Sequence, residues 1–270
     1  MKTILVATDF SPEAHHALHL ARQLAQHTGA GLVLLHVVEP PGATAPITAE
    51  ALAAAREQLM ALRLSTLAAE PGVPLRTIIE TGEADACIRE VAAAQGADLV
   101  VVGTQNHSIV KRLVLGTHTK RLVRLASRPV LAVKHPAPNF DVRRLVFPSD
   151  FTAEAEQAAP GLHRVLTLFP DAALHLLHVV APGGARGDIQ ERIAAFIKRH
   201  GLARAMPAVV EAPNRAVGIR RFAESTAADL VLLATHGRTG FSRLLQASVA
   251  EQVAAKALPP VLTFHFEPES

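Results

Sequence analysis

The chain contains two copies of one unit, and this internal repeat constrains the fold more than any other feature. Ala97–Gly103 reads A-D-L-V-V-V-G, and Ala228–Ala234 reads A-D-L-V-L-L-A. Thr8–Phe10 near the start returns as Ser149–Phe151, in the same order along the chain. A unit of about 130 residues is too long for a solenoid repeat and has the length of a whole domain. The sequence therefore predicts a tandem pair of similar domains.

The length and composition agree with two globular domains. A chain of 270 residues has room for two domains that each bury a core, and 49% of the residues are hydrophobic. We predict the domains at residues 1–136 and 141–268. The Pro-rich segment His135–Asp141 lies at their junction, where a short Pro-rich linker is semi-rigid. We expect the two domains to pack together.

Composition also excludes several classes of protein. The net charge is only +3, and Trp and Tyr are absent, so nucleic-acid binding is not expected. No apolar run is long enough to cross a membrane, and the N-terminus enters a strand at once, which leaves no room for a signal peptide. Cys87 is the only cysteine, so no disulfide framework is expected. We predict a cytoplasmic protein without a membrane partner.

The first copy alternates short apolar runs with helical patterns. Its predicted strands are residues 3–8, 31–38, 75–80, 99–103 and 129–134. Its predicted helices are residues 14–26, 49–69, 84–95 and 117–127. Ser11 is the expected cap of the first helix, Pro12 its first residue, and Gly29 its end. Such strands imply a five-stranded parallel sheet flanked by helices, an α/β doubly wound (Rossmann-like) domain.

The second copy repeats this pattern with one shortened region. Its predicted strands are residues 145–149, 174–180, 208–211, 230–234 and 261–266. Much of the long second helix is missing, and Gly183–Gly187 stands in its place. This segment has two interpretations, a flexible connection or a phosphate loop. We favour the connection, because no strand runs directly into it and no Lys-Ser/Thr pair follows.

Polar and small residues follow the strands of the first copy. Thr8 and Asp9 end the first strand, Val38 ends the second, and Gly103 ends the fourth. In a doubly wound sheet, ligands bind beyond the carboxyl ends of the strands, where the strand order reverses. Asp9 could accept a hydrogen bond from a ribose hydroxyl, and backbone groups near Val38 could contact a flat base.

A second feature of the first copy suits an anion. Gly116 and Thr117 begin the predicted last helix, where exposed amides attract phosphate, and the Thr117 hydroxyl can donate a further hydrogen bond. His118 follows directly and could touch a phosphate, although a solvent-exposed side chain is the alternative. Together with the strand ends, these residues predict a nucleotide-shaped site.

At these motifs the chain resembles a tandem member of the universal stress protein family. Nucleotide-binding members carry Gly, two residues, Gly, nine residues and Gly-Ser/Thr. The first copy has Gly103, Asn106, Gly116 and Thr117 at these places, so asparagine replaces the middle glycine. Asparagine is among the residues best able to adopt a left-handed backbone after glycine. The resemblance implies that the first copy binds ATP, or AMP or ADP, and leaves open whether Mg²⁺ accompanies the phosphates.

The second copy departs further from the family pattern. Its string is Ala234, Gly237, Ala247 and Ser248, so both outer glycines are alanine. Each alanine adds a β-carbon where a phosphate or ribose would approach the backbone. We interpret this half as degenerate for a triphosphate, yet able to hold a smaller or different ligand.

Several residues have structural interpretations beside the functional ones. Asp9 and Asp150 could form turns, with Asp9 favoured as a ligand contact and Asp150 as a turn residue. We expect Asp98 and Asp229 to be turn or capping residues, and Cys87 to be a small core residue. The second half contains most of the phenylalanines, and five of these are expected in the core or at the domain interface: Phe147, Phe151, Phe169, Phe196 and Phe222.

The fourteen histidines invite a metal hypothesis. His15 and His19 lie four residues apart on a helix and could share a metal ion. No third ligand is identifiable, so we expect surface histidines and no metal site. His36 and His178 occupy matching strand positions, where we expect buried, hydrogen-bonded side chains.

Three functions follow. The first is a stress-response protein that binds an adenine nucleotide in its first domain and acts as a nucleotide-dependent regulator or scaffold for an unknown protein partner. The second is an interaction scaffold without nucleotide binding. The third is a slow ATPase, although no Walker lysine or nucleophile–base pair is visible and we expect no catalytic residue. The resemblance also implies a pseudo-two-fold pairing of the edges Val130–Val133 and Val261–Phe264, and is compatible with a homodimer.

Overall fold

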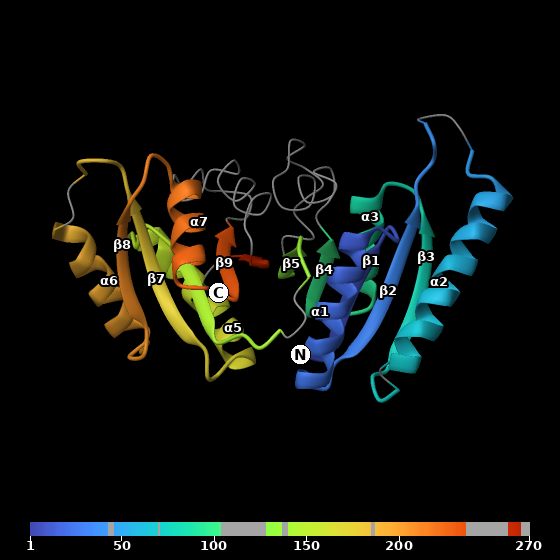
Figure 1. Cartoon of the computed structure of the whole chain (residues 1–270), viewed down its shortest axis with the longest axis horizontal. Helices are drawn as coiled ribbons and strands as arrows, with labels where there is room; N and C mark the ends of the chain where they lie inside the picture. Colours follow the sequence, from blue (N-terminus) through green and yellow to red (C-terminus); the bar gives the residue numbers. More distant parts are fainter. Residues whose placement is uncertain are drawn as a thin grey trace. The chain divides into compact units, whose positions relative to one another are not determined.

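The computed structural model of the protein describes residues 1–42, 46–69, 71–103, 128–136, 140–184, 187–235 and 259–265. The chain divides into two compact units, Met1–Phe140 and Asp141–Ser270. Each unit contains a parallel sheet with helices against it (Figure 1). The predicted α/β architecture of both copies is therefore confirmed.

The first unit has a five-stranded sheet in the order β3-β2-β1-β4-β5. Its strands are β1 (Thr3–Thr8), β2 (Gly31–Val38), β3 (Leu75–Thr81), β4 (Leu99–Gly103) and β5 (Val130–Val133). Its described helices are α1 (Pro12–Thr28), α2 (Ala49–Ala69) and α3 (Ala84–Ala94). All four strand pairs are parallel, and the order reverses between β1 and β4. The helix expected at residues 117–127 lies outside the described residues.

Helix α1 shows how local sequence sets the element ends. The Ser11 side chain accepts a hydrogen bond from the Ala14 amide, and Pro12 is the first helical residue, as predicted. Gly29 ends the helix in a left-handed conformation with φ 70°. The buried face of the helix carries seven apolar residues at helical spacing: Ala14, Ala17, Leu18, Leu20, Ala21, Leu24 and Ala25.

The second unit repeats the topology with the order β10-β9-β6-β7-β8. Its strands are β6 (Arg144–Pro148), β7 (Ala173–Val180), β8 (Met206–Glu211), β9 (Leu230–Thr235) and β10 (Val261–His265). Its described helices are the 3-10 helix η2 (Ala153–Ala158), α5 (Ala159–Leu168), α6 (Gly187–Arg199) and α7 (Arg215–Ser225). All four strand pairs are parallel.

The two copies differ where the sequence predicted a shortened region. Helix α6 has 13 residues, whereas α2 has 21. The glycine-rich segment before α6 includes Gly183 with φ 73°, a left-handed conformation that glycine adopts without a steric penalty. The Gly184 amide donates a hydrogen bond to the Ala181 carbonyl oxygen at 2.9 Å, so a turn follows β7 directly.

Aromatic side chains fill the core of the second unit. Phe147 and Phe196 are fully buried, and the Phe151 ring centroid lies 5.4 Å from that of Phe196. The prediction that these residues lie in the core is confirmed. Phe169 and Phe222 are only half-buried, so they lie outside the core, and the alternative of a domain interface stays a prediction for them. The Phe222 ring instead meets His175 edge-on, with centroids 5.5 Å apart.

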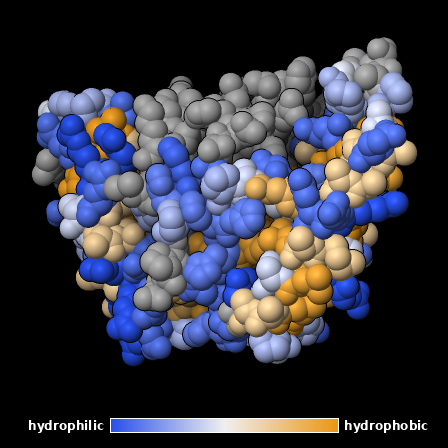
Figure 2. Space-filling view, turned by 45° about the vertical axis from the view of Figure 1, so that its right-hand side comes forward, coloured by the Kyte–Doolittle hydropathy of each residue, from blue (hydrophilic) through white to orange (hydrophobic). Residues whose placement is uncertain are grey.

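Helix α2 packs against the edge of the first sheet through a narrow row of buried side chains. Ala55 and Leu59 are buried on it, whereas Met60 and Leu64 are 48% and 61% exposed. Figure 2 brings this side of the first unit forward and shows apolar side chains along it. Across the described ranges, no helix combines the length and the apolar character that crossing a membrane requires.

Candidate functional site

A tight turn follows β1 and carries two of the predicted site residues. The Thr8 hydroxyl accepts a hydrogen bond from the Phe10 amide at 3.1 Å, and Asp9 Oδ1 accepts one from the Ser11 amide at 3.0 Å. Phe10 between them has φ 62°, in the left-handed region. The two side chains therefore stabilise a backbone path that a phenylalanine seldom adopts.

The same strain occurs at the matching turn of the second unit. Phe151 has φ 53° there, and the Ser149 hydroxyl accepts from its amide at 3.1 Å. A left-handed conformation costs a residue other than glycine about 1–2 kcal/mol. Strained residues of this kind cluster at functional sites, where the surrounding structure holds them in place. The turn is therefore a candidate site feature in both units.

Neighbouring strands bring the predicted residues of the first unit to one edge. Thr8 pairs with His36 in β2, and Ala7 pairs with Val102 in β4. Asp9, Val38 and Gly103 then lie just beyond or at the same carboxyl ends of these parallel strands. This edge spans the point between β1 and β4 where the strand order reverses, which is where doubly wound sheets bind ligands.

Four other predicted residues lie outside the described residues: Asn106, Gly116, Thr117 and His118. The loop residues Gly237, Ala247 and Ser248 of the second copy do so as well. The site residues therefore stay a prediction, of which the structure describes the part formed by Thr8, Asp9, Val38 and Gly103.

The backbone near Val38 is partly engaged within the protein. The Val38 carbonyl oxygen accepts a hydrogen bond from the Gly82 amide at 3.1 Å, and Val180 accepts one from Ala212 at 3.0 Å. A carbonyl oxygen has two lone pairs, so one remains for a ligand. These bonds tie the end of the second strand to the segment that leads into the next helix.

The close packing of β4 against helix α1 requires a glycine at position 103. A β-carbon at this position would lie 2.5 Å from the Ala14 nitrogen and 2.6 Å from the Glu13 carbonyl oxygen. Both atoms belong to the backbone of α1, which cannot yield as a flexible side chain can. Glycine is thus required at the end of β4 because α1 begins against it, whether or not a ligand approaches.

The two matching histidines join neighbouring strands at this edge. Nδ1 of His36 lies 2.8 Å from the Thr8 carbonyl oxygen, and Nδ1 of His178 lies 2.8 Å from that of Ser149. A carbonyl only accepts, so Nδ1 carries the proton and donates in both cases. The predicted hydrogen bonds are confirmed, although both side chains are half-buried and not fully buried.

The surroundings of the two histidines differ. The Phe10 ring lies 4.4 Å from the His36 ring, centroid to centroid, and is itself half-buried. Phe151, its counterpart, turns into the aromatic core and is 3% exposed. Burial lowers the pKa of His178, and the nearby charges of Arg192 and Arg215 lower it further, against the opposing effect of its backbone hydrogen bond and of Asp150.

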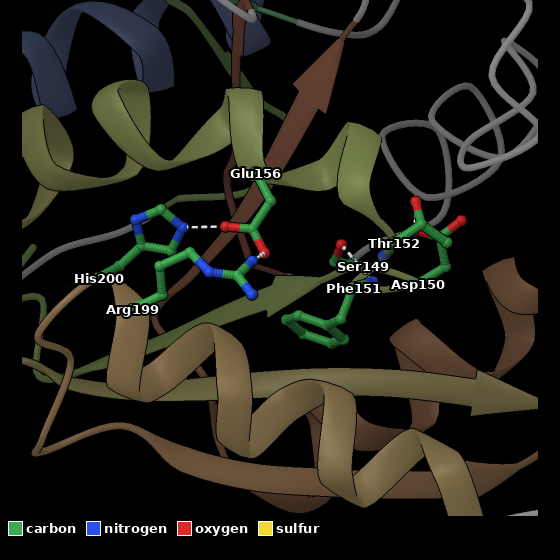
Figure 3. Close-up of polar contacts among 7 residues, drawn as sticks. All are labelled: Ser149, Asp150, Phe151, Thr152, Glu156, Arg199 and His200. Atoms are coloured by element: carbon green, nitrogen blue, oxygen red, sulfur yellow. Dashed lines mark hydrogen bonds and ion pairs between the residues drawn. The ribbon is translucent and has the colours of Figure 1, made fainter.

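Figure 3 shows the turn of the second unit beside a group of charged side chains. Asp150 Oδ1 accepts from the Thr152 amide at 3.1 Å and from the Thr152 hydroxyl at 3.0 Å. The turn role expected for Asp150 is therefore confirmed. Arg192 from α6 also donates to the Asp150 carbonyl oxygen at 3.2 Å.

Glu156 makes a clamp that the sequence did not predict. Its two carboxylate oxygens bind Arg199 and His200, which lie at the end of α6 (Figure 3). The partners are more than forty residues away along the chain, and the repeat offers no hint, because His15 occupies the corresponding position in the first copy. The clamp fastens η2 to α6 and is a structural feature of the second unit.

A pocket opens at the carboxyl edge of the second sheet. It has a volume of about 260 Å³, including the solvent at its mouth. Strand β6 and the following turn contribute Ser149 and Asp150, β7 contributes His178, and α7 contributes Arg215. The second unit therefore has a small hollow, lined by apolar and polar side chains, at the edge where the sequence predicted a degenerate or different site.

The other predicted structural carboxylates hold strand ends. Asp98 Oδ2 accepts from the Lys2 amide at 2.5 Å and the Thr3 amide at 3.0 Å. Asp229 repeats this with Arg143 at 3.0 Å and Arg144 at 2.9 Å. Partial desolvation works against the charged form of Asp98, but the two amide bonds, the N-terminal charge and Arg128 together hold its pKa below the ordinary value.

Cys87 and the helix histidines have ordinary structural positions. Cys87 is buried, as predicted for a core residue, and burial raises its pKa together with nearby carboxylates, which disfavours a reactive thiolate. His15 and His19 are exposed on α1, as expected of surface histidines. Within the described part of the chain, His, Cys, Asp and Glu side chains form no group of three or more that could hold a metal ion.

Comparison with known proteins gives a consistent result for both units. The model of the universal stress protein family matches residues 1–134 and 141–265. A universal stress protein of Mycolicibacterium smegmatis is 26% identical over 96% of this chain and 95% of its own length. A single-unit universal stress protein of Thermus aquaticus is 35% identical over 136 residues, which are 49% of this chain and 98% of that protein.

Solved structures show the same architecture over the full length. The crystal structure of a universal stress protein from Archaeoglobus fulgidus has a TM-score of 0.73 and 17% identity, with 98% of each chain covered. A protein of unknown function from Pseudomonas aeruginosa has a TM-score of 0.64 and 21% identity, and covers 98% of this chain. At these identities the likeness concerns the fold.

Proposed function

Since the chain belongs to the universal stress protein family, we propose that its first unit binds ATP or a related adenine nucleotide and that the chain acts as a nucleotide-dependent regulator or scaffold. Members of this family often bind adenine nucleotides. The bound nucleotide would change the surface that the chain offers to a protein partner.

The observation that carries this proposal is the position of Asp9. Its side chain is exposed at the reversal point of the first sheet, next to a strained turn, and only Oδ1 is engaged by the Ser11 amide. Among the described residues, Oδ2 has no protein partner. A carboxylate oxygen at this edge can accept a hydrogen bond from a ribose hydroxyl, which is the contact that a nucleotide would offer.

The residues proposed to bind the phosphates of the nucleotide are inferred from sequence motifs alone. Asn106, Gly116, Thr117 and His118 would surround the phosphates, with amide groups at a helix start and the Thr117 hydroxyl as donors. Mg²⁺ on the phosphates is compatible with this arrangement, because Mg²⁺ binds largely through substrate phosphates and water.

A scaffold without nucleotide is the second candidate, and the packing of Gly103 favours it. Glycine at this position is explained by α1, so it is not by itself a sign of a ligand. Asn106 in place of the middle glycine of the family motif also favours a scaffold without nucleotide. The third candidate, a slow ATPase, has no further support from the described residues and would be rejected by an ATP hydrolysis rate equal to that of buffer.

The proposal is tested by calorimetric titration of the whole chain with ATP and Mg²⁺. The repeat supplies a matched pair of variants, Asp9→Ala and Asp150→Ala. A hydrogen bond to a charged group contributes about 1.5–3 kcal/mol, so Asp9→Ala should weaken ATP binding by about ten- to a hundredfold. Asp150→Ala should leave the affinity unchanged.

Two outcomes would contradict the proposal. A flat titration of the unmodified chain would favour the scaffold, provided circular dichroism shows a folded protein. Equal weakening of ATP binding by both variants would mean that ATP binds in both units, or that it contacts neither Asp9 nor Asp150. Native mass spectrometry distinguishes these cases, because one adenine nucleotide per chain is the expected count.

A further inference from the structure

The side of helix α2 opposite the sheet is apolar. Met60 and Leu64 are 48% and 61% exposed, and they are neighbours on one face because they lie four residues apart. We define the outer face of α2 by the exposed residues that share this side of the helix: Ala53, Glu57, Met60, Ala61, Leu64 and Ala68. Figure 2 shows apolar side chains gathered on this side of the first unit. Exposed apolar side chains that adjoin one another are typical of a contact surface.

The inner side of α2 is apolar as well. Ala55 and Leu59 are buried there, where the helix packs on β2 and β3. A helix with apolar residues all round is normally covered all round. Within the described part of the protein, only the inner side of α2 is covered. The outer face therefore has the composition of a surface that a further element covers.

The matching helix of the second unit does not share this feature. Helix α6 buries Ile189, Ile193 and Phe196, whereas Glu191 and Lys198 are exposed. Across residues 187–199, no exposed position carries an apolar side chain larger than alanine. The two units have the same strand order, so the fold does not require an apolar outer face at this helix. The apolar face is a property of the α2 sequence.

The charges beside the outer face make it complementary to itself. Glu57 lies three residues before Met60, and Arg63 lies three residues after it. In an antiparallel pair of α2 helices centred on Met60, Glu57 of each copy is therefore level with Arg63 of the other, and two-fold symmetry forms this ion pair twice. A parallel pair would place like charges level with each other, which is repulsive. Antiparallel helices also bring opposite ends of their dipoles together.

The length of α2 sets the strength of such a contact. Ala53, Ala61 and Ala68 allow two helix axes to approach to about 8 Å. With 21 residues the helix is about 31 Å long, so one face covers roughly 300 Å², against about 800 Å² per partner in a standard stable interface. A contact of this size is reversible, with an expected Kd on the order of 100 μM.

We infer that the outer face of α2 binds the same face of a second copy of the chain, in a reversible antiparallel pair centred on Met60. The Met60 and Leu64 side chains are removed from water in this pair. The two ion pairs between Glu57 and Arg63 select the antiparallel direction and the register. The inference does not rest on nucleotide binding.

Static light scattering of the full chain, without nucleotide, tests the contact between about 10 μM and about 500 μM. The average mass should rise with concentration. Met60→Lys should abolish the rise, because two lysines then meet at the centre of the pair. Met206→Lys is the matched control, since Met206 is 40% exposed on β8 and its substitution should leave the rise unchanged. A mass independent of concentration, or equal association of the two variants, would overturn the inference.

Charge reversal tests whether the partner is a second copy. Glu57→Arg places an arginine level with Arg63 of the other copy and should weaken association about tenfold. The double variant E57R/R63E restores both ion pairs and should recover association. A helix of a different protein would not follow this reversal. Weak association of the double variant, in a chain that circular dichroism shows to be folded, therefore contradicts a second copy as the occupant.

Cysteine cross-linking tests the centre of the pair. Met60→Cys should form a disulfide dimer under mild oxidation, because residue 60 faces its own copy. Ala53→Cys should not, since the two copies of residue 53 lie about 21 Å apart along the pair, beyond the Cα separation of about 7 Å that a disulfide spans. Cys87 is buried and is present in both variants. Equal cross-linking of the two variants would overturn the antiparallel arrangement.

Discussion

Gly103 and Glu13 approach so closely that a β-carbon on Gly103 would lie 2.6 Å from the Glu13 carbonyl oxygen. The end of β4 thereby passes directly beneath the first turn of α1. This contact holds the end of β4 in place at the edge of the sheet where Asp9 and Val38 also lie. The geometry of the candidate site therefore depends on a glycine that a ligand need not touch.

The first prediction concerns this contact. Gly103→Ala should lower the free energy of unfolding by about 1–3 kcal/mol, because the added methyl group forces the backbone of α1 away from β4. Chemical denaturation measures the change. Gly72→Ala is the control, since a β-carbon at Gly72 would meet no atom within 4 Å. Equal stability of the two variants would show that α1 can move at no cost.

The second prediction concerns the carboxylate that joins β1 to the start of β4. Asp98→Ala should reduce stability at pH 7 by about 1 kcal/mol, because the amides of Lys2 and Thr3 lose their acceptor. The folded-state pKa of Asp98 is depressed, so its contribution is present above the unfolded value near 3.8 and is lost as the pH falls through the folded value.

Urea unfolding of both proteins at pH 7 and pH 3 measures this dependence. The difference in stability should shrink at pH 3, because the wild-type carboxylate is then increasingly protonated. A difference of the same size at both pH values would mean that packing rather than charge gives Asp98 its effect. Asp229→Ala provides the matched change in the second unit, where the same pair of amide bonds is present.

The third prediction concerns the acid sensitivity of the second unit. Burial lowers the pKa of His175 and His178 below the ordinary value of 6.5. The unfolded chain then binds more protons between 6.5 and the folded values, so stability should decline as the pH falls through this range. His178→Asn keeps an N–H donor for the Ser149 carbonyl but does not titrate, and should make the decline less steep.

NMR titration of the imidazole protons provides the direct measurement. His178 should titrate below the ordinary histidine value of 6.5, because burial lowers its pKa. A midpoint for His178 above 6.5 would contradict both the pKa direction and the expected loss of stability in acid. Denaturation of wild type and His178→Asn at pH 7.5 and pH 5.5 then relates the titration to folding.

The elements that could be predicted were those with a strong local pattern. The bounds of β1, β2, α2 and β4 agree with prediction to the residue, because apolar runs and helix caps act over short stretches of chain. The second copy was harder to read, since its helix after the Asp150 turn begins as the 3-10 helix η2 and has no side-chain cap.

The candidate site could be predicted only in outline. The ends of β1, β2 and β4 were identified because the repeat and the parallel topology place them at one edge. Sequence reasoning treated Gly103 as a ligand contact and did not foresee its contact with α1. It also missed the Glu156 clamp and the position of Arg215 in the wall of the pocket, because neither residue belongs to a motif.

The sequence by itself determined that this chain has two copies of one parallel α/β unit, and at which residues β1, β2 and β4 end. Repeated apolar runs, caps and glycines are local signals, and they suffice for that purpose. Only the tertiary structure decided that Phe10 and Phe151 are strained, that Gly103 supports α1, and that Asp150, His178 and Arg215 share one pocket. Such contacts join residues far apart in the chain, and their distances depend on packing that no local pattern encodes.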